Sequence, residues 1–163
     1  MGLSRLDNFL KSSRGTILYV NPNDLDATDS IENQGNSLTR PFKTIQRALL
    51  EAARFSYQRG LNNDRFAKTT IQVYPGDHVV DNRPGFIPDG TNNYRLRNGT
   101  TSDNLPAFDL STNLDLASAD NNLFKLNSIH GGVIIPRGTS LVGVDVRKTK
   151  IRPKYIPLSL IHI

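Results

Sequence analysis

Three aspartates at near-alternating positions are the first residues whose types and spacing could do chemistry. Asp24, Asp26 and Asp29 lie in a stretch rich in Asn, Asp and Ser, and carboxylates are ligands that Ca²⁺ prefers. A calcium loop of the EF-hand kind also needs a glycine and a closing glutamate in register, and both are absent. We therefore interpret these aspartates as a solvated Asx-rich turn and predict no metal site.

Histidines could supply acid-base or acyl-transfer chemistry at two places. His78 follows Asp77, but adjacent residues on a strand point to opposite faces, so we interpret His78 as structural. His130 begins the sequence H-G-G, which is similar to the oxyanion loop of esterases. That chemistry also needs G-x-S-x-G, whereas Ser140 lies in G-x-S-x-x-G, so we interpret these glycines as turn residues. The sequence predicts no catalytic residue and no cofactor.

Basic side chains could bind phosphate groups. The formal net charge is +5, but Lys and Arg alternate with Asp along most of the chain. The locally basic stretch holds Arg147, Lys148, Lys150, Arg152 and Lys154. No aromatic stacking residues interleave with it, so we interpret it as a solvated strand face and expect no nucleic-acid partner.

Composition limits the class of protein. The 163 residues, 37% of them hydrophobic, suit one domain with a buried core. With no cysteine there is no disulfide and no thiolate metal site. No apolar run approaches the length that spans a membrane, and the N-terminal residues lack the apolar core of a signal peptide. We expect no membrane insertion and no secretion signal.

Short runs rich in β-branched residues predict the strands. They occupy residues 16–20, 69–74, 78–80, 132–135, 140–144 and 149–152. Pro75-Gly76 suits a type II turn between the second and third strands. Residues 136–138 and 145–147 separate the last three. Short strands joined by tight turns indicate stacked or wrapped coils.

The clearest helix is predicted from Pro41 to about Arg59. Thr39 can cap it, Pro41 lies where a missing N–H costs little, and Gly60 supplies a stop. Its apolar face consists of Phe42, Ile45, Ala48, Leu49 and Ala52. The polar residues that lie largely elsewhere are Lys43, Gln46, Arg47, Glu51 and Arg54. We therefore predict that the helix buries one side only.

Two further segments complete the predicted organisation. Residues 1–14 carry apolar residues at helical spacing and form an attachment or docking segment, which packs either on a partner or on this chain. Residues 15–157 hold the helix and the coils, interrupted at 81–127 by a long insertion rich in Asn, Asp, Gly and Pro. An insertion of that length is functional or carries minor structure of its own.

The order of these motifs resembles the opening of pectate-lyase-like proteins. The resemblance is carried by residues 35–49 (GNSLTRPFKTIQRAL) and 71–76 (IQVYPG), and by residues 133–143 (VIIPRGTSLVG) and 149–153 (TKIRP) as the next coils. It implies a mainly β chain with one N-terminal capping helix, at the start of a truncated right-handed parallel β-helix. The helix would cover the apolar interior that such a fold exposes at its end.

A closer resemblance is to a family of large virion structural proteins of contractile-tailed phages that infect marine cyanobacteria. It is carried by residues 1–11 (MGLSRLDNFLK), 18–30 (LYVNPNDLDATDS) and 138–155. It implies an N-terminal piece of a tail fibre, spike or baseplate component, located in the virion tail and in the host cytoplasm during assembly. The absence of cysteine fits that reducing compartment.

The resemblance also implies partners. These are other phage tail proteins, host surface polysaccharide and a homotrimer of the chain itself. The alternative function on the same fold is a polysaccharide lyase or hydrolase, a depolymerase, whose active groove lies on later coils. Paired carboxylates on one exposed sheet of those coils would favour the enzyme, and their absence would favour the structural role.

The last six residues differ from both patterns. Residues 158–163 (LSLIHI), which include His162, are what CTG TCT CTT ATA CAC ATC encodes, the mosaic end of a transposon adaptor used in sequencing libraries. We expect the natural sequence to stop near Pro157 and the rest to be adaptor read as protein. Synonymous codons that differ from the adaptor would contradict this expectation.

Overall fold

The structure is a computed structural model that describes residues 15–56, 68–88, 94–96 and 123–156. Predictions for residues 1–14, for the end of the helix at residues 57–60, for residues 158–163 and for most of 81–127 lie outside the described residues. The elements are β1 (Thr16–Val20), α2 (Ile45–Ser56), β2 (Thr69–Val73), β3 (Gly76–Val80), β4 (Phe86–Pro88), β5 (Tyr94–Leu96), the 3-10 helix η4 (Leu123–Leu126), β6 (Thr139–Gly143) and β7 (Thr149–Pro153). Five of the predicted strands are confirmed within two residues at each end.

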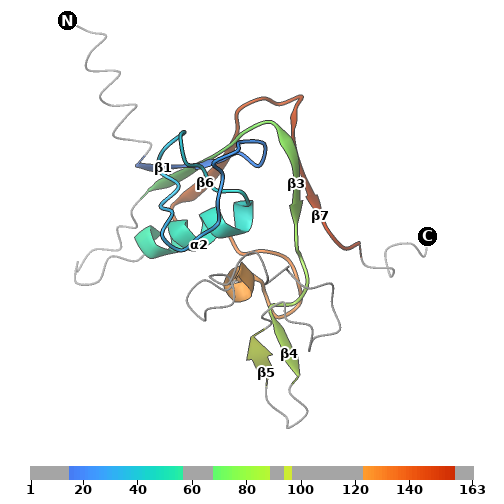
Figure 1. The fold of residues 1–163 in the computed structure, drawn as a ribbon. Helices are drawn as coiled ribbons and strands as arrows, with labels where there is room; N and C mark the ends of the chain where they lie inside the picture. The colour runs from blue at the N-terminus through green and yellow to red at the C-terminus, as the bar shows by residue number, and fades with distance from the viewer. Residues whose placement is uncertain (1–14, 57–67, 89–93, 97–122, 157–163) are drawn as a thin grey trace, which may run out of the picture.

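Two parallel sheets form the body. The first has the order β1-β2-β6, and the second pairs β3 with β7. The register places Leu18, Ile71 and Leu141 side by side on neighbouring strands. Figure 1 shows α2 beneath the three-stranded sheet, with β3 and β7 running down beside it. The sheets therefore meet at an angle that the helix fills, and they do not close into a barrel; β4 and β5 add a small antiparallel pair.

Hydrogen bonding continues around the corner between the two sheets. Tyr74 donates its backbone N–H to the Val20 carbonyl at 2.9 Å, and Val144 donates to the Val73 carbonyl at the same distance. The predicted type II turn is wrong, because Gly76 has a φ of 155° instead of about +80° and is the first residue of β3. The chain thus bends between strands while successive segments stay hydrogen-bonded to each other.

The core lies between α2 and the three-stranded sheet. Alternate residues of β1 and β2 point inward, as a strand with one buried face requires. The fully or almost fully buried side chains are Leu18, Val20, Phe42, Ile45, Ala48, Leu49, Ala52, Ile71 and Val73. The predicted apolar face of the helix is therefore confirmed as the face that packs on the sheet.

The helix starts later than predicted. Phe42 donates its N–H to the Tyr19 carbonyl at 2.8 Å, and its carbonyl accepts from Asn21 at 3.0 Å. These bonds hold Phe42 in an extended bridge beside Val20, so the helix can begin only at Ile45. The prediction that Thr39 caps the helix is wrong, because the Thr39 side chain bonds the Ser37 hydroxyl.

The helix is also buried on its polar side, so the prediction that it buries one side only is wrong. Gln46, Arg47 and Glu51 are all buried. Arg47 pairs with Glu51 at 2.9 Å and donates to the Asn33 carbonyl at 3.1 Å. The loop before the helix therefore folds over this side and bonds to it, which periodicity alone does not reveal.

The strand predicted at residues 132–135 is not formed. Val133 makes an isolated antiparallel bridge with Asn127, and Ile134 donates its N–H to the Leu126 carbonyl at 2.7 Å. The segment lies against the end of η4 and not beside a strand of either sheet. The ends of the predicted insertion thus carry minor structure, namely the β4–β5 pair and η4.

Candidate functional site

The three aspartates singled out for metal binding have different environments. Asp24 accepts a hydrogen bond from the Asp26 N–H at 3.0 Å, as in an Asx turn, and the Asp26 side chain is exposed. Asp29 is buried, at 4% exposure, so the interpretation of a solvated turn is wrong for this residue. Within the described part of the chain, no three His, Cys, Asp or Glu side chains gather as a metal ion would require.

Asp29 caps α2 from a distance of 15 residues. Its Oδ1 accepts the backbone N–H of Lys43 at 2.8 Å and of Thr44 at 3.1 Å, and its Oδ2 accepts the Thr44 hydroxyl at 2.8 Å. Burial raises the pKa of the Asp29 carboxyl above its usual value of 3.8, against the lowering effects of these bonds and of Arg47. The Asp29 carboxylate therefore stabilises the start of the helix by capping it.

Asp77 and His78 lie on opposite faces of β3, as predicted. Asp77 is exposed, and hydrogen bonds from Arg152, 2.8 to 2.9 Å long, lower the pKa of its carboxyl. His78 is buried, and its Nε2 lies 2.8 Å from the Tyr74 carbonyl, to which it donates. The two side chains therefore have separate partners and do not form an acid-base pair.

The H-G-G segment belongs to a turn. Gly131 and Gly132 have φ angles of 95° and 87°, values that favour glycine. Ser128 donates its N–H to the Gly132 carbonyl at 3.0 Å, while Gly132 donates to the Asn82 carbonyl at 2.8 Å. The interpretation as turn residues is confirmed. Ser140 lies in β6, where it pairs with Thr70.

The two ends of the stacked strands differ. Beyond β1 the sheet edge is covered, because Tyr19 donates its N–H to the Gly35 carbonyl at 2.8 Å and Phe42 donates to Tyr19. Beyond β6 and β7 no further strand is paired within the described residues. The structure thus has a covered edge at β1 and open edges at β6 and β7.

An apolar groove lies at the open side. It has a volume of about 330 Å³ and includes Ile45, Leu49, Val80, Val133, Leu141 and Ile151 in its lining. Ile71 in β2 is 0% exposed, whereas Ile151 in β7 is 53% exposed. Apolar burial therefore decreases toward the open edges. An unpaired strand edge beside an apolar groove can accept a further strand through backbone hydrogen bonds and alternate side chains.

A buried polar cluster near the groove was missed by sequence reasoning. Asp81 binds Arg83 through two bonds of 2.9 and 2.8 Å, and the guanidinium lies over the rings of Phe124 and Tyr155. The side-chain amide of Asn127 donates to the carbonyls of Asp81 and Arg83 at 2.7 and 2.8 Å. The cluster fixes the two ends of the predicted insertion to each other. Phe124, Asn127 and Tyr155 lie more than 40 residues from Asp81 and Arg83 in the sequence, so no local motif indicates the cluster.

Comparisons with known proteins give no identification. No protein-family model, no curated protein and no solved structure matches the chain. In the part of the chain that the structure describes, no helix has the length and apolar character needed to cross a membrane. The apolar groove lies beside strand edges that have no further partner within the described residues.

Proposed function

We propose that the described residues form the capped first coils of a right-handed parallel β-helix in a structural protein of a contractile phage tail. In this proposal β1 belongs to the first coil, β2 and β3 to the second, and β6 and β7 to the third. The protein serves as a fibre, spike or baseplate-associated component that takes part in recognition of the host surface.

One observation supports the β-helix, namely that the two parallel ladders share their layers. Thr69 pairs with Thr139 in the first sheet and Gly76 pairs with Thr149 in the second, so both sheets join the same successive chain segments. Crossovers between parallel strands of one sheet are almost always right-handed. The covered edge at β1 and the open edges at β6 and β7 fit a solenoid with one finished end.

Cysteine pairs in this cysteine-free chain test the proposed coils. Thr70→Cys with Ser140→Cys joins the first ladder, and Val79→Cys with Arg152→Cys joins the second. Neighbouring strands lie about 4.8 Å apart, which a disulfide spans. The mismatched control, Thr70→Cys with Val142→Cys, is displaced by two residues and exceeds the about 7 Å limit.

We expect mild oxidation to close both matched pairs, separately and together, and to leave the control pair reduced. Mass spectrometry of peptides without reduction identifies the links. A control pair that closes as fast as the matched pairs would contradict the register. Closure of only one matched pair would contradict the shared layers and, with them, the coil.

The tail assignment rests on the resemblance of residues 1–11, 18–30 and 138–155 and needs its own experiment. Antibodies raised against the 163-residue chain should label the tails of particles of the phage that encodes it, as seen by immunogold microscopy. Particles that lack the protein in immunoblots would contradict the proposal. Release of reducing ends from host polysaccharide by the full-length protein would support the depolymerase instead.

A further inference from the structure

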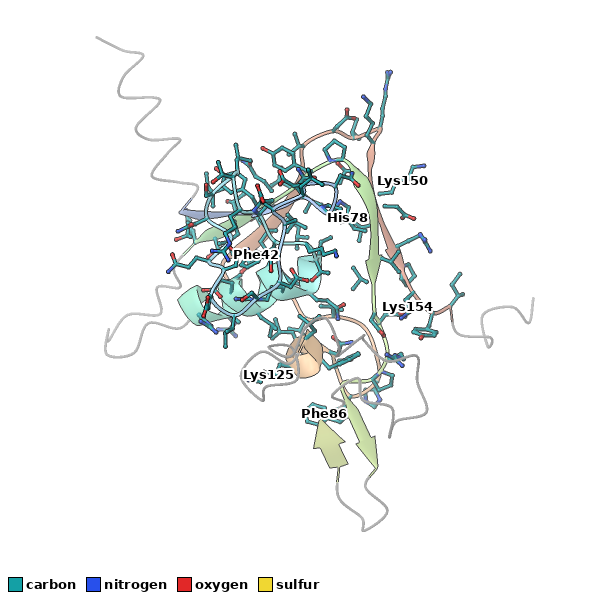
Figure 2. The ribbon with its side chains drawn as sticks, viewed as in Figure 1. Phe42, His78, Phe86, Lys125, Lys150 and Lys154 are labelled. Atoms are coloured by element: carbon teal, nitrogen blue, oxygen red, sulfur yellow. The ribbon has the colours of Figure 1, made fainter. Side chains whose placement is uncertain are left out.

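A row of cations lies on the outer face of β7. Along β7 the side chains alternate between two faces. Ile151, Arg152 and Pro153 border the apolar groove, but the Arg152 guanidinium bonds Asp77 on the exposed face of β3. The exposed cations of β7 and its flanks are Lys148, Lys150, Arg152 and Lys154. We call these four residues the cation stripe. Figure 2 places Lys150 and Lys154 along β7, away from α2.

The carboxylates around the stripe neutralise only part of its charge. Asp77 is held by Arg152 and also lies opposite Lys150. Asp81 lies 3.9 Å from the Lys154 amine, but it is buried and already binds Arg83 at 2.8 Å. A third carboxylate, Asp145, accepts the backbone N–H groups of residues 147 and 148. The stripe therefore keeps a positive excess.

The spacing of the stripe favours an extended ligand. Lys150 and Arg152 lie two apart in β7, about 6.6 Å along the strand. Lys148 lies in the turn before β7 and Lys154 in the bend after it, so the four cations follow one another along the strand direction. A compact anion could contact only one or two of them. A linear polymer with repeated anionic groups can contact all four cations at once. Each of these contacts is exposed to solvent, so it is weak and is screened by salt.

The surroundings of the stripe distinguish between classes of polymer. Binding of single-stranded nucleic acid relies on aromatic rings on which bases stack. The ring next to the stripe is Tyr155, and it is engaged by the guanidinium of Arg83 at 5.1 Å and the amine of Lys154 at 5.6 Å. Val79, the residue opposite Arg152, is aliphatic. These features favour a polymer recognised through charge alone.

We propose that the cation stripe binds an acidic polysaccharide, one whose sugars carry carboxylate or sulfate groups, lying along β7. The inference deepens the proposed function, on which it rests for its biological meaning, because it states which kind of host glycan the protein would recognise. Binding by the purified chain does not depend on location in a virion. Failed tail labelling and failed glycan binding are therefore distinguishable results.

The test measures binding of the purified 163-residue chain to immobilised polymers at low salt. Polygalacturonate presents carboxylates and dextran sulfate presents sulfates, while neutral dextran and oligodeoxythymidylate serve as comparisons. The variant is Lys148→Gln with Lys150→Gln. The matched control is Lys68→Gln, an exposed lysine that precedes β2. A second variant, Asp77→Asn, removes the exposed carboxylate beside the stripe. Circular dichroism checks that each variant is folded.

We expect binding to at least one acidic polysaccharide, and loss of that binding at high salt. The double variant should weaken binding roughly four- to twentyfold, since one exposed ion pair is worth roughly two- to fivefold. Lys68→Gln should change it less than about twofold, and Asp77→Asn should tighten it. The proposal is overturned by no binding to either acidic polysaccharide, by an unaffected double variant, by an equal loss in Lys68→Gln, or by tighter binding to the oligonucleotide.

Discussion

Replacing Asp29 by alanine removes three hydrogen bonds from the start of α2. The backbone N–H groups of Lys43 and Thr44, which bond to Oδ1 at 2.8 and 3.1 Å, would lose their partner in a buried site. Loss of a helix cap costs about 1 kcal/mol, and unsatisfied buried donors add about 1 to 3 kcal/mol. We expect Asp29→Ala to lower the free energy of unfolding by about 2 to 4 kcal/mol.

Asp29→Asn separates the hydrogen bonds from the charge. The amide oxygen can accept the same two backbone N–H groups, so we expect a loss of less than about 1 kcal/mol. Because burial raises the pKa of the Asp29 carboxyl in the folded chain, the folded state binds the proton more tightly than the unfolded state. The stability that this carboxyl contributes is present below pH 3.8 and is lost as the pH rises through the folded pKa.

Urea unfolding followed by circular dichroism at pH 4, 5 and 7 measures both effects. The other titrating groups are common to the parent and the Asn variant, so the difference between them isolates Asp29. The parent should lose stability relative to Asp29→Asn as the pH rises. Asp24→Ala is the matched control, because the Asp24 carboxylate accepts a local bond from the Asp26 N–H, two residues away. An Asp29→Ala variant as stable as this control, or a parent that gains on Asp29→Asn with rising pH, would refute the reasoning.

Three further predictions concern single side chains. Gly35→Ala should lower the free energy of unfolding by about 2 to 4 kcal/mol in urea titrations, because φ is 61° and a Cβ would meet the Phe42 ring; a change below about 0.5 kcal/mol would contradict this. Thr69→Val should leave stability unchanged or raise it by up to about 1 kcal/mol, because the buried hydroxyl has no hydrogen-bond partner among the described residues; a clear loss would show that it is bonded. The pKa of Asp77, followed by NMR, should lie below 3.8 and return toward that value in Arg152→Gln; a pKa that does not move would disprove the pairing.

The local sequence pattern was sufficient to predict elements that bury one face and expose the other. The run TILYV at β1 alternates between the core and the outside, and its bounds follow from the sequence alone. The start of α2 could not be predicted in the same way, because the N–H of Phe42 donates to Tyr19 in β1 and its carbonyl accepts from Asn21 just after the strand. A helix-capping signal at Thr39 could not compete with a bridge formed by residues more than 20 positions away.

The candidate site was less predictable than the fold. Asp29 looked like one of three similar turn aspartates, and only tertiary packing separates the buried cap from its exposed neighbours. The apolar residues 133–135 suggested a strand, but Ile134 bonds to Leu126 and the segment lines the groove instead. Basic residues of β7 were recognised as a strand face, and the register of β3 shows which cations meet a carboxylate.

The covered edge at β1 has a consequence for the order in which the chain can fold during synthesis. The bonds of Tyr19 with Gly35 and Phe42, and of Asp29 with Lys43 at the start of α2, all join residues within 15–56. This end can therefore form before β6 and β7 leave the ribosome. Each later strand then adds to the one made before it. Each added strand covers the edge of the strand before it in the same sheet, which shortens the time in which that edge can pair with a second nascent molecule.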